Sequence, residues 1–184
     1  MELRAIQKTE LSTCLDIIHR SFKSVADKLN LTKENCPGHT SFMPMEKLEQ
    51  FWDWGFLMYG LFSEKKELVG YMSLSKVPDR ENVFALHNIC VLPEYRKKGY
   101  GKILLDYAKQ KVKELNGDVL FVDFIEEHTA LKEWYLKNGF VHKGTEKYEH
   151  LPFTVGKAEY YIGVLFRQAA KSADEMQKNC SVTV

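Results

Sequence analysis

A short glycine-containing and basic run is the part of this sequence best suited to bind a ligand. It reads Arg96-Lys97-Lys98-Gly99-Tyr100-Gly101-Lys102 and lies between a strand-like run and a helix-like run. The first amides of a helix have no intrahelical partner, and the helix dipole adds partial positive charge there. Glycine leaves the backbone open to close approach. We therefore expect this loop to bind a compact polyanion such as a pyrophosphate.

The glycine spacing excludes two common phosphate-binding motifs. A dinucleotide fingerprint reads G-x-G-x-x-G, and counted from Gly99 its third glycine is replaced by Leu104. No stretch matches the G-x-x-x-x-G-K-[ST] pattern of a P-loop. What stands here is R-x-x-G-x-G after Val91-Leu92-Pro93. Taken alone, this pattern is also compatible with a solvated turn at a basic helix start.

A second motif lies downstream, where residues 134–140 contain the pattern Y-x-x-x-G-F from Tyr135 to Phe140. Together the two motifs resemble the GNAT superfamily of acetyl-CoA-dependent N-acetyltransferases, most strongly over residues 89–101. The resemblance spans residues 1–166 as one N-acetyltransferase domain and leaves residues 167–184 as a C-terminal extension. It implies an N-acetyltransferase that uses acetyl-CoA as its cofactor.

The resemblance also implies which residues contact coenzyme A. The loop binds its pyrophosphate, and backbone amides of residues 89–91 serve as oxyanion donors, which requires a local break in strand pairing. The family's usual asparagine is replaced by His128, whose ring can still donate or accept a hydrogen bond. His128 is otherwise a residue at a helix start, beside the better capping residue Thr129. The expected cofactor-binding residues are Ile89, Cys90, Val91, Arg96, Lys97, Lys98, Gly99, Tyr100, Gly101, Lys102 and His128.

Two residues are candidates for proton transfer. In the resemblance, Tyr135 protonates the departing thiolate; the alternative is a core aromatic beside Trp134. In the resemblance, the strand that leads into the phosphate loop often carries a carboxylate, but the strand-like run 83–92 contains no Asp or Glu. His87, which lies in this run, is therefore the candidate base, or the residue that relays the proton through water. Histidine titrates near pH 6.5 and can accept a proton under physiological conditions. The alternative for His87 is a buried histidine bonded within the sheet.

The acceptor amine is the least defined part of the prediction. In the resemblance, residues 22–55 form the acceptor wall, and Trp52 and Trp54 suit an apolar acceptor or a cation, or simply build core. Residues 150–155 close the opposite side as a lid or as an ordinary strand connection. Two functions stay open: transfer of acetyl to a primary amine of a small molecule or peptide by direct attack in a ternary complex, and a non-catalytic acyl-CoA-binding module.

Length and composition fit one globular domain of 184 residues, with a formal net charge of +1. No apolar run approaches the ~18 residues that span a bilayer, and the N-terminus lacks the apolar core of a signal peptide. We expect a cytoplasmic protein without nucleic-acid or membrane partners; homodimer formation stays open. The four cysteines form no C-x-x-C pair and are interpreted as free thiols. Cys36 and His39 fall short of a zinc site, so no metal is expected.

Hydrophobic periodicity predicts an α/β fold with a mixed, mostly antiparallel sheet of six to seven strands flanked by about four helices. A central apolar strand is expected at 119–125, and Thr9 is expected to cap the first helix. Predicted strands cover 2–8, 56–62, 68–77, 83–92, 119–125, 140–148 and 159–166. Predicted helices cover 11–29, a short segment after Pro44, 99–116 and 129–138.

Overall fold

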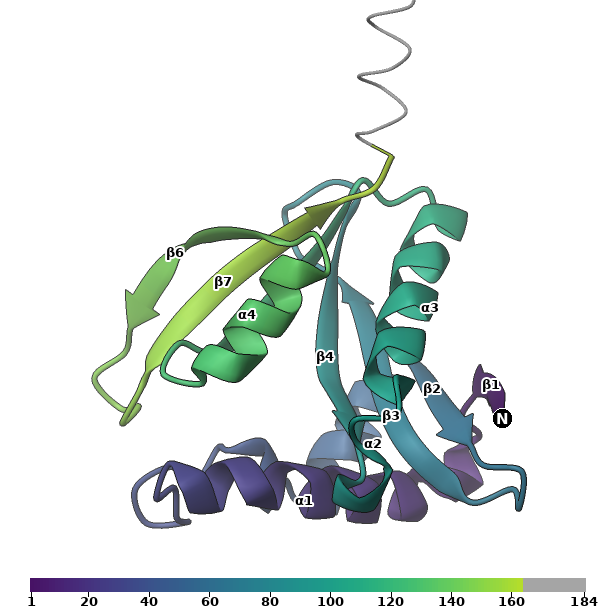
Figure 1. Cartoon of the computed structure of the whole chain (residues 1–184), viewed down its shortest axis with the longest axis horizontal. Coiled ribbons are helices and arrows are strands. Elements are labelled where there is room, and N and C mark those ends of the chain that lie inside the picture. The colour runs from purple at the N-terminus through teal and green to yellow at the C-terminus, as the bar shows by residue number, and fades with distance from the viewer. Residues whose placement is uncertain (164–184) are drawn as a thin grey trace, which may run out of the picture.

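The computed structural model describes residues 1–163 as a seven-stranded sheet with helices on both faces (Figure 1). The strands are β1 (Glu2–Ala5), β2 (Leu57–Phe62), β3 (Leu68–Lys76), β4 (Val83–Val91), β5 (Val119–Ile125), β6 (Val141–Lys147) and β7 (Thr154–Tyr161). The α-helices are α1 (Leu11–Lys28), α2 (Met45–Asp53), α3 (Tyr100–Glu114) and α4 (Thr129–Lys137). The predicted fold class is confirmed. The predicted extension, residues 167–184, lies outside the described residues.

The sheet order is β1-β2-β3-β4-β5-β7-β6. All neighbouring strands are antiparallel except β4 and β5, which are joined through α3 and pair in parallel. A parallel neighbour needs a crossover connection, and α3 provides it. The loop that precedes α3 therefore lies at the end of a central strand.

Two hydrophobic cores cover the two faces of the sheet. α3 and α4 pack on one face through residues that include Leu104, Leu105 and Tyr135. α1 and α2 pack on the other through residues that include Leu11, Ile18 and Leu48. Figure 1 shows α1 and α2 on the side opposite α3 and α4. Within residues 1–163, no helix combines the length and apolarity needed to cross a membrane.

The buried face of α1 is formed by residues that include Leu11, Cys14, Ile17 and Ile18, while Phe22 is only partly buried. The predicted cap is wrong: a 3-10 turn at Lys8–Glu10 precedes the helix, and Thr9 lies inside this turn. Apolar residues outside the buried face are thus available to line a cavity.

β7 was predicted to begin at Glu159, whereas it begins at Thr154, and its predicted end lies outside the described residues. Val155 and Gly156 pair with both β5 and β6, and Thr154 pairs with β6. Gly156 interrupts the apolar pattern in this half of the strand. A larger residue would not fit at this position, because the Glu126 carboxylate occupies the space that its side chain would need. The sequence therefore predicts a loop at residues 154–158, where the structure has the first half of β7.

Candidate active site

The parallel pair β4–β5 opens soon after it forms. The strands pair only from Val83–Val119 to Ala85–Phe121, and β6 and β7 swing away from β4 in Figure 1. Two cavities lie along this opening. The split cavity, about 530 Å³, lies between the diverging strands, and the loop cavity, about 540 Å³, faces the predicted phosphate loop. Both cavities are lined by Phe22, Val25, Ile89, His128 and Leu131.

A β-bulge breaks the pairing of β4 at the opening. Ser73 pairs with His87 and Tyr71 with Cys90, so Met72 alone faces both Asn88 and Ile89. Asn88 has a φ of 52°, in the left-handed region that asparagine tolerates better than most residues. This is the break in pairing that oxyanion donors in this strand would require.

The bulge also reverses the faces of the strand. Phe84 and Leu86 belong to the α3/α4 core, whereas Cys90 and Leu92, an even number of positions later, belong to the α1/α2 core. An uninterrupted strand would place all four on one face.

Backbone groups beyond the bulge point into the opening. Leu92 donates its amide to the Val69 carbonyl at 3.0 Å, so it faces β3. Successive residues alternate, and the Val91 amide and carbonyl therefore point away from β3. By the same alternation the Ile89 amide points into the opening. These two amides are available to a ligand that lies along β4.

The predicted phosphate loop ends at the start of α3. Gly99 is the N-cap residue, with a φ of 84° and no side chain to cap the helix. The amides of Tyr100, Gly101 and Lys102 have no intrahelical acceptor. All predicted cofactor-binding residues except Lys98 line the loop cavity. The Lys98 ammonium lies 5.2 Å from the centre of the Tyr95 ring instead.

The Arg96 side chain does not face the loop cavity as a free cation. Its Nε donates to the Val91 carbonyl at 3.0 Å, and its two Nη atoms donate to Ser24 Oγ at 2.8 Å and to the Ser21 carbonyl at 2.6 Å. The guanidinium therefore connects the loop to β4 and α1. Lys97 makes no side-chain hydrogen bond or ion pair within residues 1–163, and Lys102 pairs with Asp106 at 2.5 Å.

Tyr135 lies on α4 with its side chain almost fully buried, and it lines the split cavity. Its ring packs against Phe124, Trp134 and Phe140 at centroid distances of 5.7, 5.1 and 5.2 Å. Burial raises the pKa of Tyr135 above its ordinary value. The phenol is therefore protonated at neutral pH and chemically able to donate, and the packing fixes its position.

His128 is the N-cap residue of α4, and Thr129 is not. His128 Nδ1 accepts a hydrogen bond from the Leu131 amide at 3.0 Å. In the neutral ring the proton must then reside on Nε2. His128 lines both cavities, so its second nitrogen can donate to a ligand there.

His87 lies apart from both cavities in the described structure. Its Nε2 is 2.9 Å from Ser75 Oγ, and its ring lies 5.1 Å from Phe56 and 6.5 Å from Phe51. Burial lowers the pKa of His87, so the ring is neutral at physiological pH. The imidazole is held on the α2 side of the sheet, as in the alternative of a bonded, buried histidine.

The acceptor wall differs in detail from the expectation. Neither Trp52 nor Trp54 lines the split cavity, and Trp54 is 60% exposed. The wall is built instead by Cys36, His39 and their neighbours in the segment between α1 and α2. Burial lowers the pKa of His39, whose Nδ1 lies 2.8 Å from Ser41 Oγ. This imidazole is therefore a neutral part of the wall.

Asp123 is the residue that the sequence reasoning missed. It is the single charged residue in the otherwise apolar β5, and this contrast was the available signal. Its side chain is exposed at the split cavity, on the opposite side of β5 from the buried Phe124. Surrounding protein still displaces enough water to raise the pKa of Asp123, although Lys157 opposes the shift. A carboxylate with a raised pKa is a better proton acceptor.

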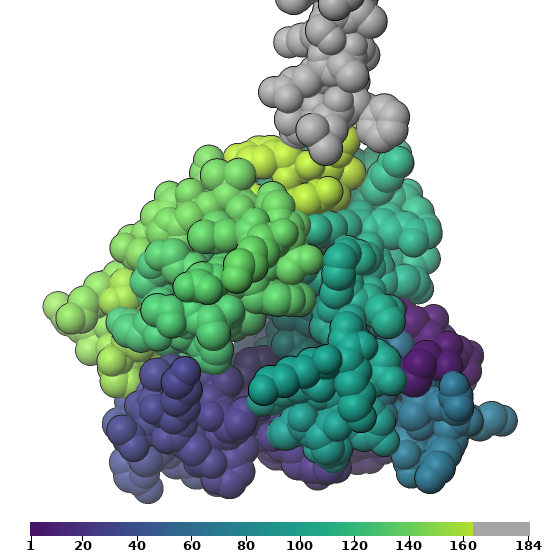
Figure 2. All heavy atoms as spheres, in the orientation of Figure 1, coloured from purple at the N-terminus to yellow at the C-terminus, as the bar shows by residue number. Residues whose placement is uncertain are grey.

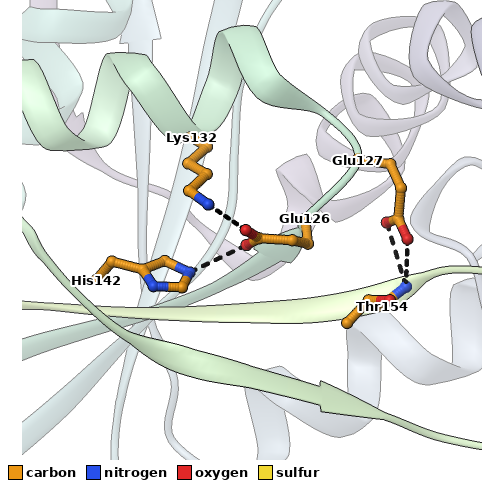
Figure 3. A network of polar contacts seen from close by, with 5 residues as sticks. All are labelled: Glu126, Glu127, Lys132, His142 and Thr154. Carbon is orange, nitrogen blue, oxygen red and sulfur yellow. Dashed lines mark hydrogen bonds and ion pairs between the residues drawn. The ribbon is translucent and has the colours of Figure 1, made fainter.

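A polar network fixes the start of α4 (Figure 3). Glu126 follows β5 directly, forms an ion pair with Lys132 of α4, and lies 3.1 Å from His142 Nε2 of β6. Glu127 accepts from the Thr154 amide of β7 at 2.9 Å. The burial of Glu126 opposes ionisation, but Lys132 and His142 outweigh it and lower the pKa of this carboxyl. Three elements are thereby joined next to His128.

Substituting Gly156 with alanine should destabilise this region. An alanine Cβ would overlap Glu126 Oε2 and approach Phe124 Cε2 to 2.6 Å. Such overpacking costs about 1–3 kcal/mol, which calorimetric or denaturant unfolding would measure. Gly38→Ala is the matched control, because no atom lies within 4 Å of its Cβ. Equal free energies of unfolding in the two variants would show that Glu126 and Phe124 move aside for the added methyl group without destabilising the protein.

The cysteines in and near the cavities are protonated thiols. Cys36 lines the split cavity and Cys90 the loop cavity, and both are free and buried. Burial raises the pKa of Cys90 to about 12 and also raises the pKa of Cys36. Since the thiolate is the nucleophile, neither group is activated for covalent catalysis.

Comparison with known proteins identifies the family. Residues 28–140 match the model of the Acetyltransferase (GNAT) family. Among solved structures, the ribosomal-protein-S18-alanine N-acetyltransferase from Escherichia coli superposes with a TM-score of 0.69 at 15% identity, covering 88% of this chain and 93% of that one. Ribosomal-protein-alanine N-acetyltransferase from Brucella melitensis gives 0.65 at 19% identity, covering 88% and 99%.

A spermidine N-acetyltransferase chimera from Vibrio cholerae and hSSAT gives a TM-score of 0.66 at 16% identity, covering 88% of this chain and 95% of that one. At these identities the structures show a shared fold. The family match spans more than half of the chain. The chain therefore belongs to the GNAT acetyltransferase family.

Proposed function

We propose that this protein transfers the acetyl group of acetyl-CoA directly to a primary amine of a small molecule or peptide, with both ligands bound together. The observation that carries the proposal is the shared wall of the two cavities. The loop cavity ends at the start of α3, where no side chain caps the helix, and the split cavity is lined by Tyr135 and Asp123. A donor in one cavity and an acceptor in the other can therefore meet at the opening of β4.

The loop cavity fits coenzyme A by its chemistry. The uncapped start of α3 offers amides to the pyrophosphate, supported by Lys97 and Lys102. The amides of Ile89 and Val91 would pair with the amide-containing arm of the cofactor. When bound, acetyl-CoA would supply the acetyl group and a thiolate leaving group.

Gly101→Val should weaken acetyl-CoA binding by at least about tenfold, or about 1.4 kcal/mol. The protein itself tolerates a Cβ here, because its nearest neighbour, Trp134 Cζ2, would lie at an ordinary 3.6 Å. The branched side chain instead fills space that the pyrophosphate needs. Calorimetric titration with acetyl-CoA measures the effect, and Gly101→Ala should show a smaller loss. Unchanged affinity in both variants would contradict the assignment of the loop.

Asp123 and Tyr135 divide the proton transfers in this proposal. An aliphatic amine is mostly protonated at neutral pH, so Asp123 accepts the proton whose loss frees the attacking lone pair and passes it to solvent. After the attack, the nitrogen of the tetrahedral intermediate loses a second proton to solvent as the amide forms. Tyr135 gives a proton to the departing sulfur and regains one from solvent. This assignment replaces His87 as base with Asp123, since Asp123 lines the split cavity and His87 does not. The pKa values of Cys36 and Cys90 support direct transfer over an acetylated cysteine.

A turnover screen tests this function. Purified protein, acetyl-CoA and a panel of polyamines, amino acids, aminoglycosides and peptides are incubated, and free thiol and the mass of the acetylated amine are both measured. Equal release of thiol and product is expected for at least one acceptor. Tight acetyl-CoA binding without turnover across the panel would favour the non-catalytic acyl-CoA-binding module. The cytoplasmic location remains part of this proposal, to be tested by cell fractionation.

A further inference from the structure

One end of the split cavity lies beside the segment that follows α1, and we call it the acceptor end. Side chains of the β6–β7 connection form a roof over this end. Leu151 and Phe153, from the β6–β7 connection, pack in one hydrophobic cluster with Leu31, Cys36 and Phe42 from the segment after α1. Figure 2 shows the surface of the β6–β7 part, in green, directly above the dark blue surface of α1 and the segment that follows it. A ligand at this end of the cavity would therefore be covered by Leu151 and Phe153.

The lining of the acceptor end is mostly apolar. Phe22, Ile125, Leu151, Phe153 and Val155 contribute the surface around the acceptor position. His39 is kept neutral by burial, as described above. Aromatic and branched side chains of this kind favour an apolar ligand group through the area removed from water.

Asp123 is the only carboxylate that lines the split cavity within residues 1–163. The two following carboxylates are engaged elsewhere, since Glu126 pairs with Lys132 and His142, and Glu127 accepts from the Thr154 amide. An acceptor with a single ammonium group can place it at Asp123. A second ammonium group would lie among apolar side chains without a partner, which costs several kcal/mol.

We infer that the acceptor is a small monoamine: one ammonium group at Asp123, and an aryl or branched alkyl group under the roof formed by Leu151 and Phe153. This inference rests on the proposed function and narrows it. The roof disfavours a protein N-terminus, which needs an exit for the following chain. The single carboxylate disfavours polyamines.

Acetylation rates of four probes test the inference on the full chain: phenethylamine, isopentylamine, spermidine and a short peptide beginning with alanine. We expect kcat/KM for the two monoamines to exceed those for spermidine and the peptide by at least about tenfold, which corresponds to about 1.4 kcal/mol. A preference for spermidine or for the peptide would overturn the inference while leaving the proposed function intact. Acetyl-CoA binding with no monoamine acetylated would also overturn it.

A charge inserted under the roof gives an independent test. Leu151→Glu adds a second carboxylate to the acceptor end, and Leu151→Gln is its neutral control of similar size. The ratio of putrescine to isopentylamine turnover should rise at least about tenfold in Leu151→Glu relative to Leu151→Gln. An equal ratio in the two variants would show that the acceptor lies elsewhere. Failure of acetyl-CoA to bind the unmodified protein would count against the proposed function itself.

Discussion

Tyr135→Phe should lower turnover by about 10²-fold while leaving acetyl-CoA affinity nearly unchanged. The substitution removes only the hydroxyl, and the ring keeps its packing against Phe124, Trp134 and Phe140. Because burial raises the pKa of Tyr135, the phenol is a fully protonated donor at neutral pH. Steady-state kinetics with the acceptor found in the screen, together with calorimetric titration of acetyl-CoA, separates the two effects.

Tyr107→Phe provides the matched control for this experiment. Tyr107 lies on α3, packs against Tyr59 at 5.1 Å, and lines neither cavity. Its variant should keep full turnover. If Tyr135→Phe does the same, the thiolate leaves unaided or takes its proton from another group, and Tyr135 serves only in packing.

Asp123→Asn should also lower kcat/KM by about 10²-fold and remove the acid limb of its pH profile. The base must be ionised, so activity of the unmodified enzyme falls as pH drops through the raised pKa of Asp123. The asparagine variant has no such transition. Measuring kcat/KM from low to neutral pH in both proteins gives the comparison, with Asp16→Asn on the outer side of α1 as control.

His87→Gln, measured in parallel, distinguishes the two candidate bases. Its acid limb should be retained, because the His87 ring is bonded to Ser75 outside the split cavity. An acid limb that disappears in His87→Gln and persists in Asp123→Asn would restore the assignment made from the sequence.

The same Asp123→Asn variant should be more stable than the unmodified protein at neutral pH. A raised pKa means that the folded state binds the proton of Asp123 more tightly than the unfolded state does. The free energy of unfolding contributed by this group therefore falls as pH rises from its unfolded pKa through its folded pKa. Removing the charge relieves this loss above the folded pKa. Thermal unfolding at neutral and acidic pH should show the gain at neutral pH only.

The sequence predicted the parts of the site that depend on local pattern. The R-x-x-G-x-G loop, the start of α3 and the position of Tyr135 on α4 follow from spacing within one loop or one helix. The apolar run of β5 predicted its bounds correctly. Such features need no knowledge of which strands are neighbours.

The remaining features depend on contacts between distant segments. The bulge at Asn88 is visible only from the pairing with β3, and two of the three hydrogen-bond partners of Arg96, Ser21 and Ser24, lie on α1, far away in sequence. The early start of β7 could not be predicted, because Gly156 breaks the strand pattern in the sequence. A glycine is needed there because Glu126 from another segment occupies the adjacent space. Asp123 is marked in the sequence as a single charge in an apolar strand, but the resemblance places the expected base on β4.

The position of α1 has a thermodynamic consequence. Phe22 and Val25 belong to the walls of both cavities, and Arg96 holds the same helix to the phosphate loop through Ser21 and Ser24. A ligand that orders this helix prepares it for the other ligand, so the two affinities should be coupled. Linkage requires the coupling to be reciprocal: acetyl-CoA must strengthen amine binding by the same factor by which the amine strengthens acetyl-CoA binding. One helix would thus make the two substrates bind cooperatively.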